Sequence, residues 1–172
     1  MGFQWSRLRW PEIVAGVAGV VLLLSMFLLP WYGYKGDLAP LAARLGVSTS
    51  GDAWNSLSTT RWLLLLTIAA ALALTYLQGT RRSPALPAAF SVFVWLLGGL
   101  TTLVLIYRVL INVPGPNEVV SRDVGAYIGL LASIVIAGAG YRSLREEGIA
   151  PQDAPKDIPT VHLDPAEVGT PS

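Results

Sequence analysis

The chain has 172 residues, of which 53% are hydrophobic and only 13% are charged. This composition is too apolar for an ordinary soluble domain and indicates an integral membrane protein with one membrane domain. The absence of cysteine excludes disulfides, thiolate metal sites, iron–sulfur clusters and cysteine nucleophiles. With a single histidine, His162, a histidine-built metal site is not expected either, and we predict no cofactor.

The formal net charge is +1, but the charges are divided along the chain. Residues 1–145 carry eleven basic and five acidic side chains, whereas residues 146–172 carry one basic and six acidic side chains. The basic residues stand beside hydrophobic segments and form no continuous run, which favours anionic lipid headgroups over nucleic acid. We therefore expect membrane lipids as partners and no nucleic acid.

Four apolar segments approach or reach the roughly 17 to 20 residues that a helix needs to cross a bilayer. They are residues 13–29, 62–77, 87–111 and 124–141. The first segment is followed by Pro30 and Trp31 instead of a small-residue cleavage site, so we do not interpret it as a cleaved signal peptide. The sequence predicts an all-α membrane protein, in which residues 1–145 form a four-helix transmembrane bundle.

The orientation of the bundle follows from the Lys and Arg residues near the segment ends. One side would carry Arg7, Arg9, Arg81, Arg82, Arg142 and Arg145. The other side would carry Lys35, Arg44, Arg61, Arg108 and Arg122. The first set is the larger and lies immediately at the segment ends, so we predict a multi-pass plasma-membrane protein with both termini cytoplasmic. Residues 31–60 would then form a long first outer loop.

Small residues four positions apart allow membrane helices to approach closely. The fourth segment contains Gly125, Gly129 and Ser133 at this spacing, and the first contains Ala15 and Gly19. These stripes are candidate helix-packing sites. They either join the four helices of one chain or mediate self-association or docking onto another membrane protein.

The outer loop contains two short helical patterns. In "LAPLAARLG", Pro40 would begin a turn of helix and Gly46 would end it. In "SGDAWNSLS", Asp52 is a candidate N-cap and Trp54 is a candidate anchor. We expect both pieces to lie on the membrane surface or to cover the outer mouth of the bundle. Trp54 would fill a local pocket or, alternatively, contact a partner.

Charged residues gather between the third and fourth segments, where Arg108 is followed by Glu118, Arg122 and Asp123. One interpretation is interfacial charge, with Arg108 paired to Glu118 or Asp123. The alternative is an outward anion or lipid-headgroup site. That site would consist of Arg61, Arg108 and Arg122.

No enzyme motif is present: the chain has no phosphate-binding glycine loop, no HExxH and no nucleophile elbow. No ionisable residue falls at the middle of a segment, which argues against ion-coupled transport. The acidic, proline-rich residues 146–172 are predicted to form a disordered cytoplasmic tail.

Four stretches resemble a group of small, uncharacterised four-span proteins of high-GC Gram-positive bacteria. They are "GDAWNSLS", "RRSPALPAAFSV", "LIYRVLINVPGP" and "GAYIGLLAS". The resemblance implies a helical membrane fold and no particular activity. The layout, with a large first outer loop, is also similar to claudin-type proteins, but the paired cysteines of the claudin loop are absent. That similarity is therefore one of architecture and implies neither a junction role nor a β-structured loop.

Taken together, these features predict a non-enzymatic membrane protein with an accessory, assembly or envelope-interaction role. The alternative is a lipid- or small-anion-binding or transport module that uses the arginines of the outer face.

Overall fold

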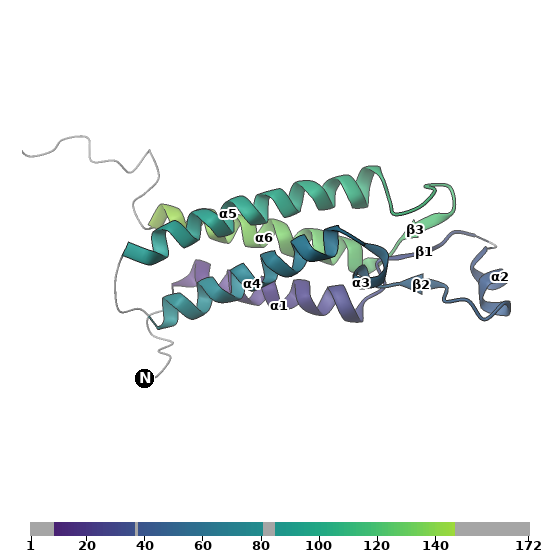
Figure 1. Cartoon of the computed structure of the whole chain (residues 1–172), viewed down its shortest axis with the longest axis horizontal. Helices are drawn as coiled ribbons and strands as arrows, with labels where there is room; N and C mark the ends of the chain where they lie inside the picture. The colour runs from purple at the N-terminus through teal and green to yellow at the C-terminus, as the bar shows by residue number, and fades with distance from the viewer. Residues whose placement is uncertain (1–8, 37, 81–84, 147–172) are drawn as a thin grey trace, which may run out of the picture.

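The computed structural model describes residues 9–36, 38–80 and 85–146, and its main body is a bundle of four long helices (Figure 1). The helices are α1 (Trp10–Leu28), α4 (Thr60–Gly79), α5 (Ala85–Ile106) and α6 (Val124–Glu146). Each helix packs against the next in this order, and α6 returns to α1. All four are long and apolar enough to cross a membrane, so the prediction of four apolar helices is confirmed.

The helices run somewhat beyond the apolar segments from which they were predicted. For example, α6 continues past Tyr141 to Glu146, and α1 already begins at Trp10. At the start of α1, Glu12 accepts a hydrogen bond from the backbone N–H of Arg9 at 3.0 Å, which satisfies a free donor of the first turn. Hydropathy marks where apolar side chains stop, whereas a helix ends where its backbone hydrogen bonds stop.

Hydroxyl groups join the helices inside the bundle. The Thr67 and Thr101 hydroxyl oxygens lie 2.6 Å apart between α4 and α5, and Thr102 of α5 donates to the Ser133 hydroxyl of α6 at 3.1 Å. Such bonds, together with close packing, are the interactions that hold helices together in membrane proteins generally.

The helix contacts are closest where one helix presents glycine. A Cβ on Gly98 of α5 would lie 3.0 Å from the backbone of Ala137 in α6. A Cβ on Gly140 of α6 would lie 2.8 Å from the backbone nitrogen of Trp95 in α5. These glycines therefore let the α5 and α6 backbones approach each other.

One end of the bundle carries a folded cap, which we define as residues 30–36, 38–59 and 112–123. Its centre is a three-stranded antiparallel sheet of β1 (Tyr32–Tyr34), β2 (Ser50–Gly51) and β3 (Val120–Arg122), in the order β2-β1-β3. The expectation of an all-α fold is thus wrong for the cap. The expectation that the outer loop lacks β-structure, because it has no paired cysteines, is also wrong, since backbone pairing between β1 and β2 forms a sheet there without any disulfide.

Two short helices complete the cap. Helix α3 (Ala53–Ser56) packs against α1, and Asp52 caps it by accepting the Asn55 backbone N–H at 2.9 Å, as predicted. Helix α2 (Leu38–Arg44) ends before Gly46, whose φ of +70° suits glycine. Figure 1 places α2 beyond the strands, at the end of the molecule farthest from the bundle. Of the two expected placements, a position over the bundle mouth fits α3 and does not fit α2, and a position on the membrane surface stays a prediction for both.

The cap lies at the opposite end of the bundle from the start of α1 and the end of α6 (Figure 1). There, an Arg9 guanidinium nitrogen donates to the Glu146 carbonyl oxygen at 3.1 Å and joins these two helix ends. Nearly all of the predicted tail, residues 147–172, lies outside the described residues.

Candidate functional site

Trp31 attaches the cap to the bundle. The side chain is fully buried, and its indole N–H donates to the Ser25 carbonyl oxygen of α1 at 2.8 Å. Its backbone N–H donates to the Gly51 carbonyl oxygen, and its own carbonyl oxygen accepts from the Asp123 backbone N–H, both at 2.9 Å. One residue thus links α1, the sheet and the start of α6.

Gly125 and Gly129 form the surface of α6 on which the indole lies. A Cβ on Gly129 would lie 2.3 Å from an indole carbon, and a Cβ on Gly125 would lie 2.6 Å from another. These two members of the predicted packing stripe therefore face a cap residue, and only Ser133, farther along α6, bonds to another helix.

The candidate packing residues of α1 are buried inside the bundle, and Gly19 faces α4. Ala15 is fully buried, and a Cβ on Gly19 would lie 3.2 Å from the Ala71 Cβ. These two positions pack helices within this chain.

Tyr32 of β1 lies beside two of the predicted arginines. Its hydroxyl donates to the Arg108 carbonyl oxygen at 3.4 Å. Burial raises the pKa of Tyr32 to about 12, although the nearby positive charges of Arg108 and Arg122 act in the opposite direction. The structure therefore brings Arg108 and Arg122 to the same side of the cap.

Arg122 closes the end of the helix that precedes it in the chain. Helix α5 ends in a π-helical turn, η2 (Tyr107–Ile111), and the Arg122 guanidinium donates to the Val109 carbonyl oxygen and, at 3.1 Å, to that of Leu110. A cation at carbonyl groups that the helix leaves free is favourable. Two of its three guanidinium nitrogens are thereby used within the protein.

The other charged residues of this region do not form the expected ion pair. Within the described part of the chain, the Arg108 side chain is paired with neither Glu118 nor Asp123. Glu118 is exposed in the turn before β3. Asp123 directly precedes α6, where a negative charge is favoured by the helix dipole, and its carboxylate lies against Gly33 of β1.

Arg61 lies among aromatic rings, at the base of α3. Its guanidinium carbon is 4.7 Å from the Trp54 ring centre and 5.6 Å from that of Trp62. The Trp54 ring is also 5.5 Å from that of Phe27 at the end of α1. Trp54 therefore joins α3 to the ends of α1 and α4, and no described contact joins Arg61 to Arg108 or Arg122.

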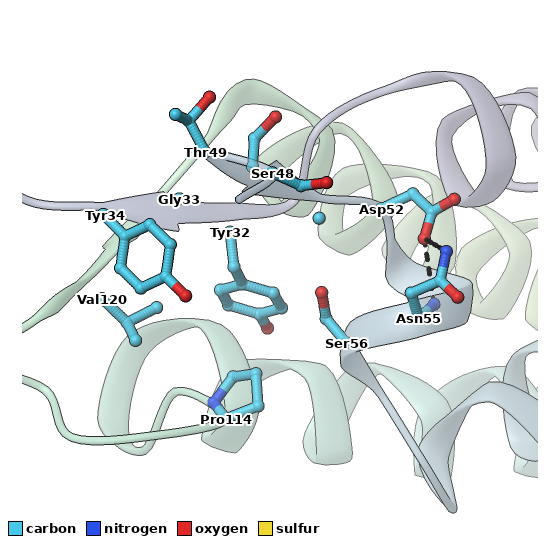
Figure 2. Close-up of a pocket in the computed structure, with 12 residues that line it drawn as sticks. Tyr32, Gly33, Tyr34, Ser48, Thr49, Asp52, Asn55, Ser56, Pro114 and Val120 are labelled. Carbon is cyan, nitrogen blue, oxygen red and sulfur yellow. Dashed lines mark hydrogen bonds between the residues drawn. The ribbon is translucent and has the colours of Figure 1, made fainter. Parts of the chain in front are cut away.

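A cleft of about 450 Å³ opens between the sheet and α3 (Figure 2). Its aromatic and apolar side consists of Tyr32, Tyr34, Pro114 and Val120. The volume falls within the range of roughly 300 to 1,000 Å³ that is common for small-molecule sites.

The facing side of the cleft is polar and comes from the end of β2 and from α3. Asp52 uses one carboxylate oxygen to accept two hydrogen bonds from Asn55, at 2.9 and 2.7 Å. The Ser56 hydroxyl lies so close to β2 that a Cβ on Gly51 would be only 2.6 Å from it. Gly51 therefore leaves room for this hydroxyl beside the strand.

The sequence interpretation did not single out this cleft. Its residues come from two separate loops, and the strands that assemble them are two or three residues long. The "GDAWNSLS" stretch was the available signal, because it supplies Asp52, Asn55 and Ser56. Within residues 9–36, 38–80 and 85–146, no group of His, Cys, Asp or Glu side chains is placed to hold a metal ion.

Comparison of the chain with protein-family models, with curated proteins and with solved structures finds no match.

Proposed function

We propose that this chain is a multi-pass plasma-membrane protein whose cap lies outside the cell and binds a component of the cell envelope. It acts by binding and not by catalysis, in an accessory, assembly or envelope-interaction role. The cleft supports this proposal most directly, because it lies in a cap that Trp31 attaches firmly to the bundle.

Placement in a membrane is supported by a belt of exposed apolar side chains around the bundle. We define the belt by Val17, Leu24, Leu66, Leu100, Leu103 and Leu131, which together come from all four long helices. Soluble monomers rarely expose continuous apolar surfaces this extensive, whereas lipid tails match them.

The proposed orientation is supported by the small excess of six Lys and Arg residues over five that the sequence gives to the bundle end away from the cap. Arg9, Arg142 and Arg145 lie at the bundle end away from the cap, on α1 and α6 or next to them. Because positively charged residues are retained on the cytoplasmic side, that end would be inside the cell and the cap outside it.

Site-specific photocrosslinking in living cells tests the binding role. A photoreactive amino acid at Ser48, which lines the cleft, should give a discrete adduct with one envelope component. The same amino acid at Tyr141, at the other end of the bundle, is the matched control. Absence of an adduct from Ser48, or the same adducts from both positions, would overturn the proposal.

The lipid- or anion-binding alternative has one supporting observation. Arg108 is half-buried, and its guanidinium has no hydrogen bond or ion pair within the described residues. If it holds an anionic headgroup, Arg108→Ala should lose a lipid that copurifies with the unchanged protein, as mass spectrometry would detect. Arg44→Ala, in the exposed helix α2, is the control.

A further inference from the structure

We propose that the cleft between the sheet and α3 binds a neutral saccharide. This inference rests on the proposed function, since it requires the cap to face the outside of the cell. It goes further by naming the chemistry of the ligand.

The two sides of the cleft match the two kinds of surface that a sugar ring presents. Sugar rings have apolar C–H faces, which pack on aromatic rings, and hydroxyl groups around the edge, which both donate and accept hydrogen bonds. Tyr34, with 39% of its surface exposed, offers a ring on one side of the cleft. Ser56 and Asn55 offer hydrogen-bonding groups on the other side (Figure 2).

Several of these polar groups are available to a ligand. The Tyr34 hydroxyl, the Ser56 hydroxyl and the second carboxylate oxygen of Asp52 have no hydrogen-bond partner within the described residues. The groups include donors and acceptors, as a hydroxyl-rich ligand requires.

The charge of the cleft argues against an anion. No Lys, Arg or His lines it, and Asp52 is its charged residue. The lining does not suit a lipid tail either, because half of its residues are Ser, Thr, Asp or Asn. A cationic amine is the remaining rival, since tyrosine rings and a carboxylate can attract one. The Tyr34 and Ser56 hydroxyls, which can both donate and accept hydrogen bonds, favour a neutral ligand rich in hydroxyl groups over an amine.

Binding should be measured on the full chain held in an amphipol. Maltoside detergents are avoided because their headgroups are themselves saccharides. Saturation-transfer NMR with maltotriose and with the trisaccharide of N-acetylglucosamine, each as a separate probe, should show transfer from protein to sugar protons for at least one of them. Tetramethylammonium, as the cationic probe, should neither bind in the cleft nor displace the sugar.

Variants then locate the binding. Tyr34→Ala and Ser56→Ala should each weaken binding about tenfold or more, and Tyr34→Phe should retain most of it because the ring is kept. Tyr76→Ala, which removes an exposed tyrosine at the other end of the bundle, should have no effect. Unchanged tryptophan fluorescence, to which Trp31 and Trp54 of the cap contribute among the six tryptophans of the chain, would show that the cap remains folded.

No transfer to either sugar, transfer that survives both Tyr34→Ala and Ser56→Ala, or displacement by tetramethylammonium would overturn the saccharide assignment. These outcomes are separable from failure of the proposed function. A crosslink from Ser48 to an envelope protein, with no sugar binding, would refute the saccharide and leave the binding role intact. A cap located in the cytoplasm would refute the binding role even if the purified protein bound sugar.

Discussion

Trp31 and the two glycines beneath it determine whether the cap is held on the bundle. The indole donates to Ser25 and lies against Gly125 and Gly129, so this side chain joins the cap to both α1 and α6. Small residues in a membrane helix are usually explained by helix packing. Here, two of them make room for a tryptophan of the cap.

This arrangement predicts a clear difference between two glycines of α6. Gly129→Ala should destabilise the protein by about 1–3 kcal/mol, because its methyl group overlaps the indole. Gly138→Ala is the matched control, since a Cβ there meets nothing within 4 Å and alanine favours helix. Unfolding in detergent, followed by tryptophan fluorescence, measures both. Equal effects at the two positions would refute the role assigned to Gly129.

Because Tyr32 is buried, we predict that the free energy of unfolding falls at high pH. Burial raises its pKa to about 12 from the usual 10, so between these values the unfolded chain releases the proton while the folded chain keeps it. The contribution of Tyr32 is therefore complete below about pH 10 and is lost as the pH rises toward 12. When the pH is raised from 10 to 12, the free energy of unfolding of Tyr32→Phe should fall by less than that of the unchanged protein. Tyr107→Phe, at an exposed tyrosine, should not differ from it.

At the level of elements, Arg122 of β3 closes the end of α5 and η2. Arg122→Gln should remove the charged donors to the Val109 and Leu110 carbonyl oxygens and cost about 2 kcal/mol. Hydrogen exchange should then quicken in residues 107–111. Arg108→Gln is the control, because its side chain forms no such bond within the described residues. Unchanged exchange in Arg122→Gln would show that these bonds do not hold the turn.

The elements also show what could be predicted from sequence. Long apolar runs identify α1, α4, α5 and α6, because a helix of that length must satisfy its own backbone in lipid. The strands could not be found in this way. Tyr32–Tyr34 pairs with Val120–Arg122 from the other loop, and runs this short show no period-two pattern.

The candidate site was predictable only in part, for the same reason. The role of Asp52 as the N-cap of α3 could be predicted, because its partner, Asn55, is only three residues away in the sequence. The aromatic surroundings of Arg61 and the position of Arg122 on α5 depend on how the loops fold together. The cleft joins Tyr34 to Ser56 across separate strands and helices, so neither loop reveals it alone.

For the molecule as a whole, the distribution of exposed apolar side chains divides it into two parts. Around the bundle, the belt covers all four helices, as expected for a surface in contact with lipid. On the cap, the exposed apolar residues Leu41, in α2, and Leu45, directly after it, lie at the far end of the molecule. The proposal places the first set in the bilayer and the second in water.

Single-cysteine labelling in intact cells tests this division, and the absence of native cysteine makes every introduced thiol unambiguous. Leu45→Cys and Ile134→Cys replace side chains that are 71% and 45% exposed in the protein itself, so only a bilayer can distinguish them. A membrane-impermeant maleimide should label Leu45→Cys in intact cells, Arg142→Cys only after permeabilisation, and Ile134→Cys only after the protein is dissolved in denaturing detergent. Labelling of Ile134→Cys in intact cells, or of Arg142→Cys before Leu45→Cys, would show that the bundle does not span the membrane as proposed.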